Sequence, residues 1–266
     1  MANQHKSLQN MTLVFDGAVA ILTLSRPDAM NAMNSQFFAD FQSVLSDLSV
    51  AESPARVLLI TAEGKGFCAG ADLKEQSGEM PPDLGKTIRN NYTPLILGLK
   101  KLPVPTIVAI NGVAAGAGMS LVCACDIAIA AREAYFIQAF INIALVPDAG
   151  STYFLPRLAG RARAAALMML GERLASEQAL DYGIISRVVD QADLMETAMT
   201  YARKLASQPT QALLSIRELL DASEQNSLVQ QLEAEAVAQQ KSGCSQDFIE
   251  GVMAFLQKRP AKFTGK

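Results

Sequence analysis

The sequence predicts a mixed α/β fold built around one large core. Short apolar and β-branched runs alternate, through roughly the first two thirds of the chain, with segments whose apolar residues recur at helical spacing. Half of the 266 residues are hydrophobic and only 18% are charged, which provides enough apolar material for a substantial core. From Asp193 onward the strand-like runs disappear. We therefore expect a large α/β body over residues 1–192 and a helical region over residues 193–266.

The first elements are marked by apolar runs and by the turn residues between them. Residues 1–16 are polar overall and are expected to form a mobile leader that contains His5. Residues 19–24 (VAILTL) form a β-branched run that ends at Arg26-Pro27-Asp28, which predicts a strand followed by a turn. Apolar residues at helical spacing predict a helix over residues 34–48, with Asn34 or Ser35 as its cap, and residues 57–61 predict a buried strand.

The later elements follow the same reasoning. Residues 105–110 and 126–130 are short apolar runs that predict further strands, and residues 77–82 form a loop that is a candidate mobile lip on a site. Pro209 is expected to start a new helix, and a final helix is expected over residues 247–257. The apolar face of these C-terminal helices is expected either to cap the body or to pack on a neighbouring subunit.

Composition excludes several classes of function. The net charge of −3 and the absence of a dense basic cluster argue against nucleic acid as a partner. No apolar run is long enough for a membrane span or a signal peptide, so a cytoplasmic protein with no membrane partner is expected. The four cysteines contain no Cys-x-x-Cys pair and are expected to be reduced and buried. With His5 as the one histidine, Ser-His-Asp and Cys-His mechanisms and a metal site are not expected.

Two glycine-punctuated segments, residues 64–74 and 111–120, each join a strand to an expected helix start. Unpaired backbone N–H groups at such a helix N-terminus suit an oxyanion or a phosphate. Glycines between a strand and a helix more often serve only to permit a tight turn. Neither segment matches the dinucleotide-binding or the P-loop signature, so taken alone they leave the ligand open.

Several motifs together resemble the crotonase, or enoyl-CoA hydratase/isomerase, superfamily. They occur in the family's order and span nearly the whole chain: Ala69-Gly70-Ala71-Asp72-Leu73, residues 111–118, Cys125-Asp126-Ile127, Val146-Pro147-Asp148-Ala149-Gly150-Ser151, and residues 155–160. The resemblance implies a spiral of ββα turns that forms two roughly perpendicular sheets. It also implies C-terminal helices that assemble subunits into homotrimers, often stacked as hexamers.

The resemblance further implies where an acyl-CoA thioester binds. The N–H groups of Ala71 and Ala117 would hold the thioester oxygen, although the family usually has Gly at the position of Ala117. Substrate would also contact Cys68, Ala69, Gly70, Asp72, Leu73, Gly116 and Phe140, and Arg26, Lys74 and Lys266 would lie near CoA phosphates. No cofactor is expected, because coenzyme A is part of the substrate.

One carboxylate, Asp148, decides the expected reaction. Hydratases of the family use two glutamates to handle water, and the matching residues here are Ser120 and Phe140, which cannot supply a carboxylate. Asp148 stands where isomerases of the family carry their acid, most closely the ring-expanding epoxyphenylacetyl-CoA isomerases. We expect it to take a proton from C2 of a 3-enoyl thioester and return it at C4.

The alternatives are a hydratase of low activity, a CoA-thioester hydrolase, and a non-catalytic acyl-CoA-binding homologue. A dehalogenase is disfavoured because its mechanism also uses a Trp and a His, and this chain has no Trp and one remote His. Outside the resemblance, an Asp before Ala-Gly is typical of a helix N-cap or an Asx-turn.

Overall fold

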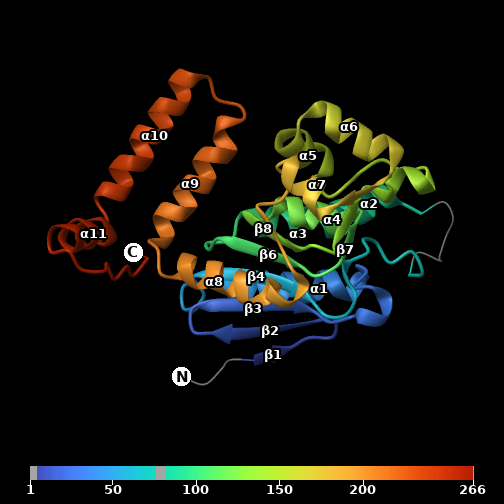
Figure 1. The fold of residues 1–266 in the computed structure, drawn as a ribbon, viewed down its shortest axis with the longest axis horizontal. Helices are drawn as coiled ribbons and strands as arrows, with labels where there is room; N and C mark the ends of the chain where they lie inside the picture. The colour runs from blue at the N-terminus through green and yellow to red at the C-terminus, as the bar shows by residue number, and fades with distance from the viewer. Residues whose placement is uncertain (1–4, 76–81, 266) are drawn as a thin grey trace.

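The computed structural model describes residues 5–75 and 82–265, and it folds the chain into two β-sheets flanked by helices (Figure 1). The strands are β1 His5–Ser7, β2 Met11–Asp16, β3 Val19–Leu24, β4 Val57–Ala62, β5 Gly66–Cys68, β6 Thr106–Ile110, β7 Val113–Ala115, β8 Ile127–Ala131, β9 Tyr135–Ile137, β10 Arg173–Ala175 and β11 Arg187–Val189. This confirms the expected α/β class.

The helices separate these strands along the chain and then continue alone to the C-terminus. They are η1 Pro27–Ala29, α1 Ser35–Ser49, α2 Leu84–Thr87, the π-helical η2 Ile88–Tyr92, α3 Thr93–Lys100, α4 Ala117–Ala124, η3 Ala139–Ile143, α5 Ser151–Ala159, α6 Arg161–Leu170, α7 Ser176–Asp181, η4 Gln191–Asp193, α8 Leu194–Ala206, α9 Thr210–Ser223, α10 Leu228–Gly243 and α11 Gln246–Leu256.

The two sheets are built by a repeated winding of the chain. The larger sheet has the order β1-β2-β3-β4-β6-β8-β11, and the smaller one has the order β10-β9-β7-β5. Strands β4, β6 and β8 are parallel neighbours in the larger sheet. Along the chain, each of them is followed by a strand of the smaller sheet, and these strands, β5, β7 and β9, are parallel neighbours of one another. The chain therefore winds as a spiral in which each turn adds one strand to each sheet.

Apolar burial explains the predicted elements. The Asn34 side chain caps α1 by accepting a hydrogen bond from the Phe37 N–H at 2.8 Å, and Phe37, Phe41 and Leu48 on one face of this helix are buried in the core. Strands β4 and β6 consist almost entirely of buried residues, as expected for parallel strands covered on both faces. Helix α8 packs across β3, β4, β6 and β8.

The expectation of a mobile polar leader is wrong for the residues that the structure describes there. His5 lies in β1, which pairs antiparallel with β2, and β2 pairs with β3. Met11 and Leu13 alternate with more exposed residues and are 0% and 1% exposed, so a period-two pattern was present in the sequence. The expectation of buried cysteines is confirmed for Cys68 and Cys123, whereas Cys125 is half-buried and Cys244 is exposed.

The helical start expected after the first glycine segment is also wrong within the described residues. Residues 73–75 form a turn in which Lys74 N–H donates to the Asp72 carboxylate at 3.2 Å. A short polar side chain that bonds the backbone two residues on favours a turn over a helix. Most of the loop predicted at residues 77–82 lies outside the described residues.

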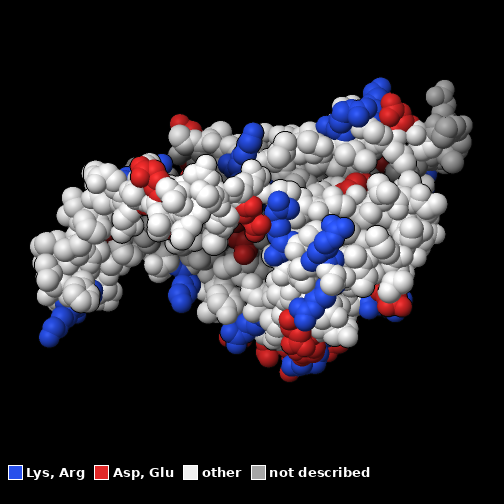
Figure 2. Space-filling model, turned by 90° about the horizontal axis from the view of Figure 1, so that it is seen from above, with Lys and Arg blue, Asp and Glu red and all other residues white. Residues whose placement is uncertain are grey.

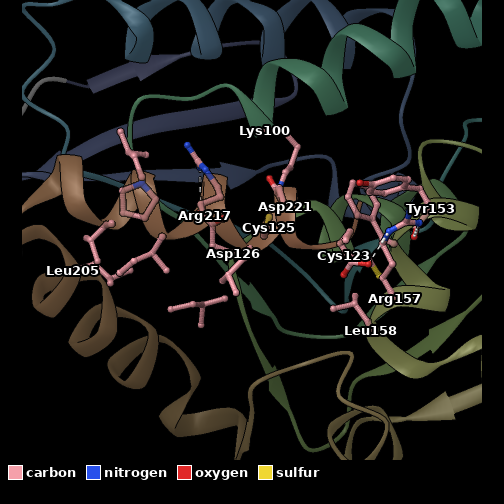
Figure 3. Close-up of a pocket in the computed structure, with 18 residues that line it drawn as sticks. Lys100, Cys123, Cys125, Asp126, Tyr153, Arg157, Leu158, Leu205, Arg217 and Asp221 are labelled. Carbon is pink, nitrogen blue, oxygen red and sulfur yellow. Dashed lines mark hydrogen bonds and ion pairs between the residues drawn. The ribbon is translucent and has the colours of Figure 1, made fainter. Parts of the chain in front are cut away.

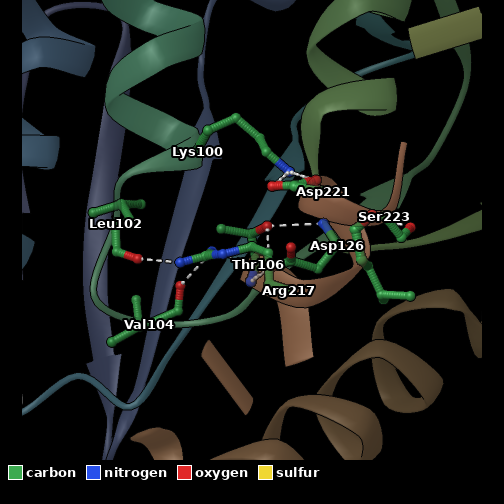
Figure 4. Close-up of polar contacts among 9 residues, drawn as sticks. Lys100, Leu102, Val104, Thr106, Asp126, Arg217, Asp221 and Ser223 are labelled. Carbon is green, nitrogen blue, oxygen red and sulfur yellow. Dashed lines mark hydrogen bonds and ion pairs between the residues drawn. The ribbon is translucent and has the colours of Figure 1, made fainter. Parts of the chain in front are cut away.

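The C-terminal helices project from the body, as Figure 1 shows for α9, α10 and α11. Polar contacts attach α9: Arg217 donates to the carbonyls of Leu102 and Val104 and pairs with Asp126, and Lys100 pairs with Asp221 at 3.0 Å (Figure 4). The apolar residues on the outer faces stay exposed, for example Leu228 at 74% and Phe255 at 83%. Within this chain α8 covers the larger sheet, whereas α10 and α11 extend beyond the body.

Candidate active site

The candidate site is built by three neighbouring strands of the smaller sheet. Strands β5, β7 and β9 are parallel neighbours, so their carboxyl ends meet at one edge. The loop after β5 carries Ala71, the turn after β7 leads to Ala117, and the segment after β9 leads through η3 to Asp148. Residues far apart in sequence are brought together because each spiral turn ends at the same edge.

The loop that carries Ala71 is fixed by a neighbouring backbone segment. Met33 N–H donates to the Gly70 carbonyl at 2.7 Å, and Asp72 N–H donates to the Met33 carbonyl at 3.0 Å. Gly70 has φ +88, and a Cβ there would stand 2.8 Å from the Ala115 carbonyl oxygen and 3.4 Å from the Ala117 nitrogen. Glycine is therefore required at this position, and it brings the two loops into contact.

The second candidate donor, Ala117, is the first residue of α4. Gly116 precedes it with φ 51, whereas Ala117 is not among the residues with positive φ, so its Cβ is accommodated without strain. Neither the Ala71 nor the Ala117 N–H donates to a protein acceptor in the part of the chain that the structure describes. Two free amides in adjacent loops, one of them at the positive end of a buried helix, form a pair suited to a developing oxyanion.

Asp148 supplies the carboxylate of the cavity. Its Oδ1 atom is buried and has no hydrogen-bond partner among the described residues. Burial raises the pKa of Asp148 to about 6 from its usual 3.8, because the charged form loses solvation. A carboxyl group that titrates near neutral pH and lacks a structural partner is suited to proton transfer.

In the structure Asp148 does not act as an ordinary helix cap. Helix α5 begins after Gly150, and no side chain caps it. Ala149 lies between the acid and the helix with φ 49, a left-handed conformation that is unfavourable for a residue with a Cβ. The chain therefore accepts local strain in the segment that presents Asp148.

A buried hydrogen-bond chain holds this segment from behind. The Ser120 and Ser151 hydroxyls lie 2.6 Å apart, and Ser120 Oγ donates to the Asp148 carbonyl at 3.1 Å or to the Gly116 carbonyl at 3.3 Å. Gln138 Nε2 donates to Ser151 Oγ at 3.1 Å, and all three of these polar side chains are 0% exposed. Ser120 thus links the acid segment to the turn that presents Ala117.

These elements enclose a cavity of about 320 Å³ with mainly apolar walls. Of the residues expected from the sequence, those that line it are Ala69, Gly70, Ala71, Leu73, Gly116, Ala117, Phe140 and Asp148. Phe140 stands against Gly116, where an added Cβ would lie 3.6 Å from its ring. An apolar wall of this kind excludes water and explains the desolvation of Asp148.

Other expected residues lie outside this cavity. Cys68 is 0% exposed, and burial raises the pKa of its thiol to about 12, so its side chain is a core group. The Arg26 guanidinium donates to Asp72 at 2.8 Å and to the Ala32 carbonyl, and this bond lowers the pKa of Asp72. Lys74 is exposed, and Lys266 lies outside the described residues.

A second cavity, of about 400 Å³, lies between α9 and the body and contains none of the expected site residues (Figure 3). Cys125 and Asp126, which belong to one of the sequence motifs, line it. Asp126 accepts from the Thr106 N–H at 2.7 Å and pairs with Arg217, so this motif fixes β6 and α9 rather than substrate. The cavity between α9 and the body is therefore a packing gap at the junction of these two elements.

Three contributors to the site escaped the sequence reasoning. Tyr92 lines the cavity from the π-helical segment η2. Asn31, 1% exposed, donates to the Glu63 and Gly66 carbonyls, and Ser151 holds the acid segment. Left-handed Asn31 after Pro-Asp-Ala-Met carried a turn signal, but no local pattern predicts which distant carbonyls it reaches.

Two free amides, one desolvated carboxylate and an apolar cavity are the parts of an enzyme site suited to proton transfer next to a developing oxyanion. The comparisons agree with a site of that kind. The model of the enoyl-CoA hydratase/isomerase family matches residues 15–266. The 1,2-epoxyphenylacetyl-CoA isomerase of Escherichia coli (strain K12) is 46% identical over 251 residues, which cover 93% of this chain and 95% of that protein.

Two further relatives give the same result. A "probable enoyl-CoA hydratase" of Rhodobacter capsulatus is 39% identical over 93% of this chain and 95% of its own length. The crystal structure of an enoyl-CoA hydratase from Bacillus anthracis superposes with a TM-score of 0.92 at 33% identity, covering 97% of this chain and all of that one. The chain belongs to the enoyl-CoA hydratase/isomerase family, and it has the crotonase fold.

The distribution of charge and the helices add two observations. On the face shown in Figure 2, Lys and Arg side chains are interspersed with Asp and Glu. Among the described residues, no helix combines the length and the hydropathy needed to cross a membrane, and no three His, Cys, Asp or Glu side chains are grouped as metal ligands.

Proposed function

We propose that this protein is an acyl-CoA isomerase that moves a double bond, or expands the six-membered ring of an arene epoxide to an oxepin, through an enolate, with Asp148 as the acid and base. The observation that carries the proposal is a single unpartnered carboxylate in the same cavity as two free backbone amides. Support from the comparisons is the name of the Escherichia coli relative, 1,2-epoxyphenylacetyl-CoA isomerase.

The first step is removal of a proton from C2 of the acyl group. With the thioester oxygen placed between the N–H groups of Ala71 and Ala117, the C2–H electron pair moves into an enolate and the proton goes to Asp148. Each preorganised donor contributes about 2–4 kcal/mol to stabilising that charge. A pKa near 6 leaves Asp148 largely ionised at neutral pH and still basic enough to accept the proton.

The second step returns the same proton to a different carbon. The charge of the enolate is shared along the conjugated system, so Asp148 can protonate C4 of a 3-enoyl thioester. In an epoxyphenylacetyl thioester, the C–C bond shared by the epoxide and the six-membered ring breaks, its electron pair enters the double bonds of a seven-membered oxepin ring, and Asp148 returns the proton from C2 to a ring carbon. The thioester carbonyl then re-forms, and no atoms or electrons are gained or lost. One group that both takes and gives the proton is sufficient for this chemistry.

Hydration is disfavoured by the two positions where hydratases carry their glutamates. The Ser120 hydroxyl is fully buried and is bonded to Ser151 and to backbone carbonyls, so it does not face the cavity. Phe140 presents an apolar ring. Activation of water needs a polar group with a free acceptor, and among the lining residues that the structure describes Asp148 is the one carboxylate.

The test offers 3-enoyl-CoA, 2-enoyl-CoA and epoxyphenylacetyl-CoA separately and follows the ultraviolet absorption of the thioester. Isomerase activity on the first or third substrate, lost in Asp148→Asn, is the expected result. Hydration of 2-enoyl-CoA as the dominant reaction would favour a hydratase, thioester cleavage a hydrolase, and binding without turnover a non-catalytic homologue. Activity of the Asp148→Asn variant equal to wild type would refute the mechanism.

We also propose that the protein assembles as a homotrimer or a hexamer through its C-terminal helices. The exposed side chains on α10 and α11 include Leu228, Val229, Phe248 and Phe255, which is an unusually apolar surface for a free monomer. Light scattering on the purified protein measures the assembly directly, and a monomer at micromolar concentration would contradict the proposal.

A further inference from the structure

One protic side chain in the cavity has no place in the mechanism described above. Tyr92 lines the same cavity as Asp148 and is 4% exposed. Among the described residues no hydrogen bond of its hydroxyl is found, and burial and nearby charge, not a hydrogen bond, raise the pKa of Tyr92. Unlike Asp148 Oδ1, the hydroxyl is not one of the fully buried atoms that lack a partner, so it keeps access to open space at the cavity wall, where a ligand oxygen can accept its bond.

Tyr92 differs in this respect from the other tyrosines of the chain. Tyr135, Tyr153, Tyr182 and Tyr201 each pack against an arginine guanidinium, with distances to the ring centroid of 3.7 to 5.9 Å. Tyr92 instead faces the cavity that contains Asp148. Burial raises the pKa of Tyr92, and the Asp148 charge raises it further, which keeps the phenol protonated as a donor.

The position of the ring is fixed. Its edge packs against Phe38 with centroids 4.7 Å apart and an interplanar angle of 72°. Tyr92 ends η2, the π-helical segment between α2 and α3, and such segments often occur at functional sites. A side chain held in this way presents its hydroxyl in one direction and loses little entropy when it binds.

The remaining polar side chains on the cavity wall are less suited to bind an acyl group. The Thr87 hydroxyl donates to the Asp83 carbonyl at 3.3 Å, and Asn142 is exposed. Among the described lining residues, the Tyr92 hydroxyl is a donor that remains free to bind a ligand, and Asp148 Oδ1 is a buried acceptor without a partner. Their combination matches an acyl group that has an acidic C–H and, farther along, an acceptor oxygen.

We propose that Tyr92 is a specificity-determining residue whose hydroxyl donates a hydrogen bond to an oxygen atom on the acyl group, so that the preferred substrates are oxygen-bearing acyl-CoA thioesters, such as arene epoxides, rather than plain enoyl chains. This inference rests on the proposed isomerase function and narrows its substrate class. Tyr92 transfers no proton in the reaction, and its bond holds the oxygenated group while Asp148 moves the proton.

The first experiment compares Tyr92→Phe with wild type on epoxyphenylacetyl-CoA and on a 3-enoyl-CoA of similar size. We expect kcat/KM for the epoxide to fall about 30-fold and kcat/KM for the enoyl substrate to change less than about threefold, because only the epoxide loses a bond. Tyr182→Phe removes a hydroxyl that lies outside the cavity and is the matched control. Equal losses on both substrates would overturn the inference, since they would indicate a role through Asp148 or the fold.

The second experiment measures binding and does not depend on turnover. Titration calorimetry compares 2-hydroxyphenylacetyl-CoA with phenylacetyl-CoA, which lacks the ring oxygen. Wild type should favour the hydroxylated ligand about tenfold, and Tyr92→Phe should bind the two ligands equally. If wild type isomerises neither substrate, the proposed function fails, and the binding ratio still judges the Tyr92 contact. Equal affinities in wild type would overturn the inference even where isomerase activity is found.

Discussion

Substitution of Asp148 by Asn should abolish activity and stabilise the fold, and the stabilisation should depend on pH. The carboxyl group keeps its buried Oδ1 without a partner, and burial raises its pKa to about 6. The folded protein therefore destabilises the ionised form of Asp148 relative to the protonated form. An amide of the same shape has no charge to desolvate, so removing the charge should release that cost.

The size of the effect follows from the pKa. A change from 3.8 to about 6 corresponds to about 3 kcal/mol, and partial solvent access through the cavity reduces this to about 2 kcal/mol. Because the folded state holds the proton more tightly than the unfolded state, wild-type stability falls as the pH rises from about 4 to 6. The advantage of the Asn variant should be absent well below pH 4, grow across that window and be complete above it.

Thermal unfolding of both proteins at several pH values measures this difference. At pH 7.5 we expect the midpoint of Asp148→Asn to lie about 5 °C above wild type, and the two midpoints to converge near pH 4. The same variant should lose about 10²–10⁴-fold in kcat, and wild-type kcat/KM should rise with pH through an apparent pKa near 6. Asp181→Asn, at an exposed aspartate outside the cavity, controls for the loss of a charge. A stability difference that is the same at every pH would refute the reasoning.

Three further predictions test the framework around the acid. Ser120→Ala removes the hydroxyl that links the Asp148 and Gly116 carbonyls, and it should lower kcat about tenfold with little change in KM. Ser120→Thr should restore part of the activity. Steady-state kinetics measure both variants, and a change in KM alone would contradict the prediction. Gly70→Ala places a Cβ 2.8 Å from the Ala115 carbonyl oxygen at a residue with φ +88. The free energy of unfolding, measured in urea, should fall by about 1–3 kcal/mol, and kcat should also fall. A variant as stable as wild type would contradict this prediction. Arg217→Ala removes the hydrogen bonds that attach α9 to the carbonyls of Leu102 and Val104. Amide hydrogen exchange in residues 210–223 should become faster, while exchange in β4 stays unchanged. Unaltered exchange in α9 would contradict the role of Arg217.

The sequence predicted the elements that bury long apolar faces, and it missed those that depend on distant partners. Residues 19–24 and 57–62 and helix α1 were predictable because their periodicity and the Asn34 cap are local signals. The three-residue strands β5, β7 and β9 were not, because strands this short among small residues have no pattern of their own and exist through pairing. The polar leader was misread because the segment is polar overall, whereas its pairing in the sheet depends on two buried residues, Met11 and Leu13, on either side of Thr12.

The candidate site divides in the same way. Asp148, Ala71 and Ala117 were predicted through a family resemblance carried by ordered motifs, and the structure brings them to one cavity. Tyr92 and Ser151 were not predicted, since each acts through a contact that only the folded chain creates. Arg26 was expected near phosphate, but its pairing with Asp72 gives it a role in holding the loop next to Ala71.

The proposed oxyanion hole consists of the backbone amides of Ala71 and Ala117, so this half of the proposed chemistry does not depend on the identity of a side chain. A point mutation can erase a carboxylate, but it leaves a peptide N–H in place unless it introduces proline or deforms the loop. A lineage can therefore lose or exchange its acids while it retains the ability to stabilise an enolate. The same scaffold can then pass from adding water to moving a double bond through a few side-chain changes at positions such as Ser120 in α4 and Phe140 in η3. Names such as hydratase and isomerase can therefore coexist among relatives of this chain.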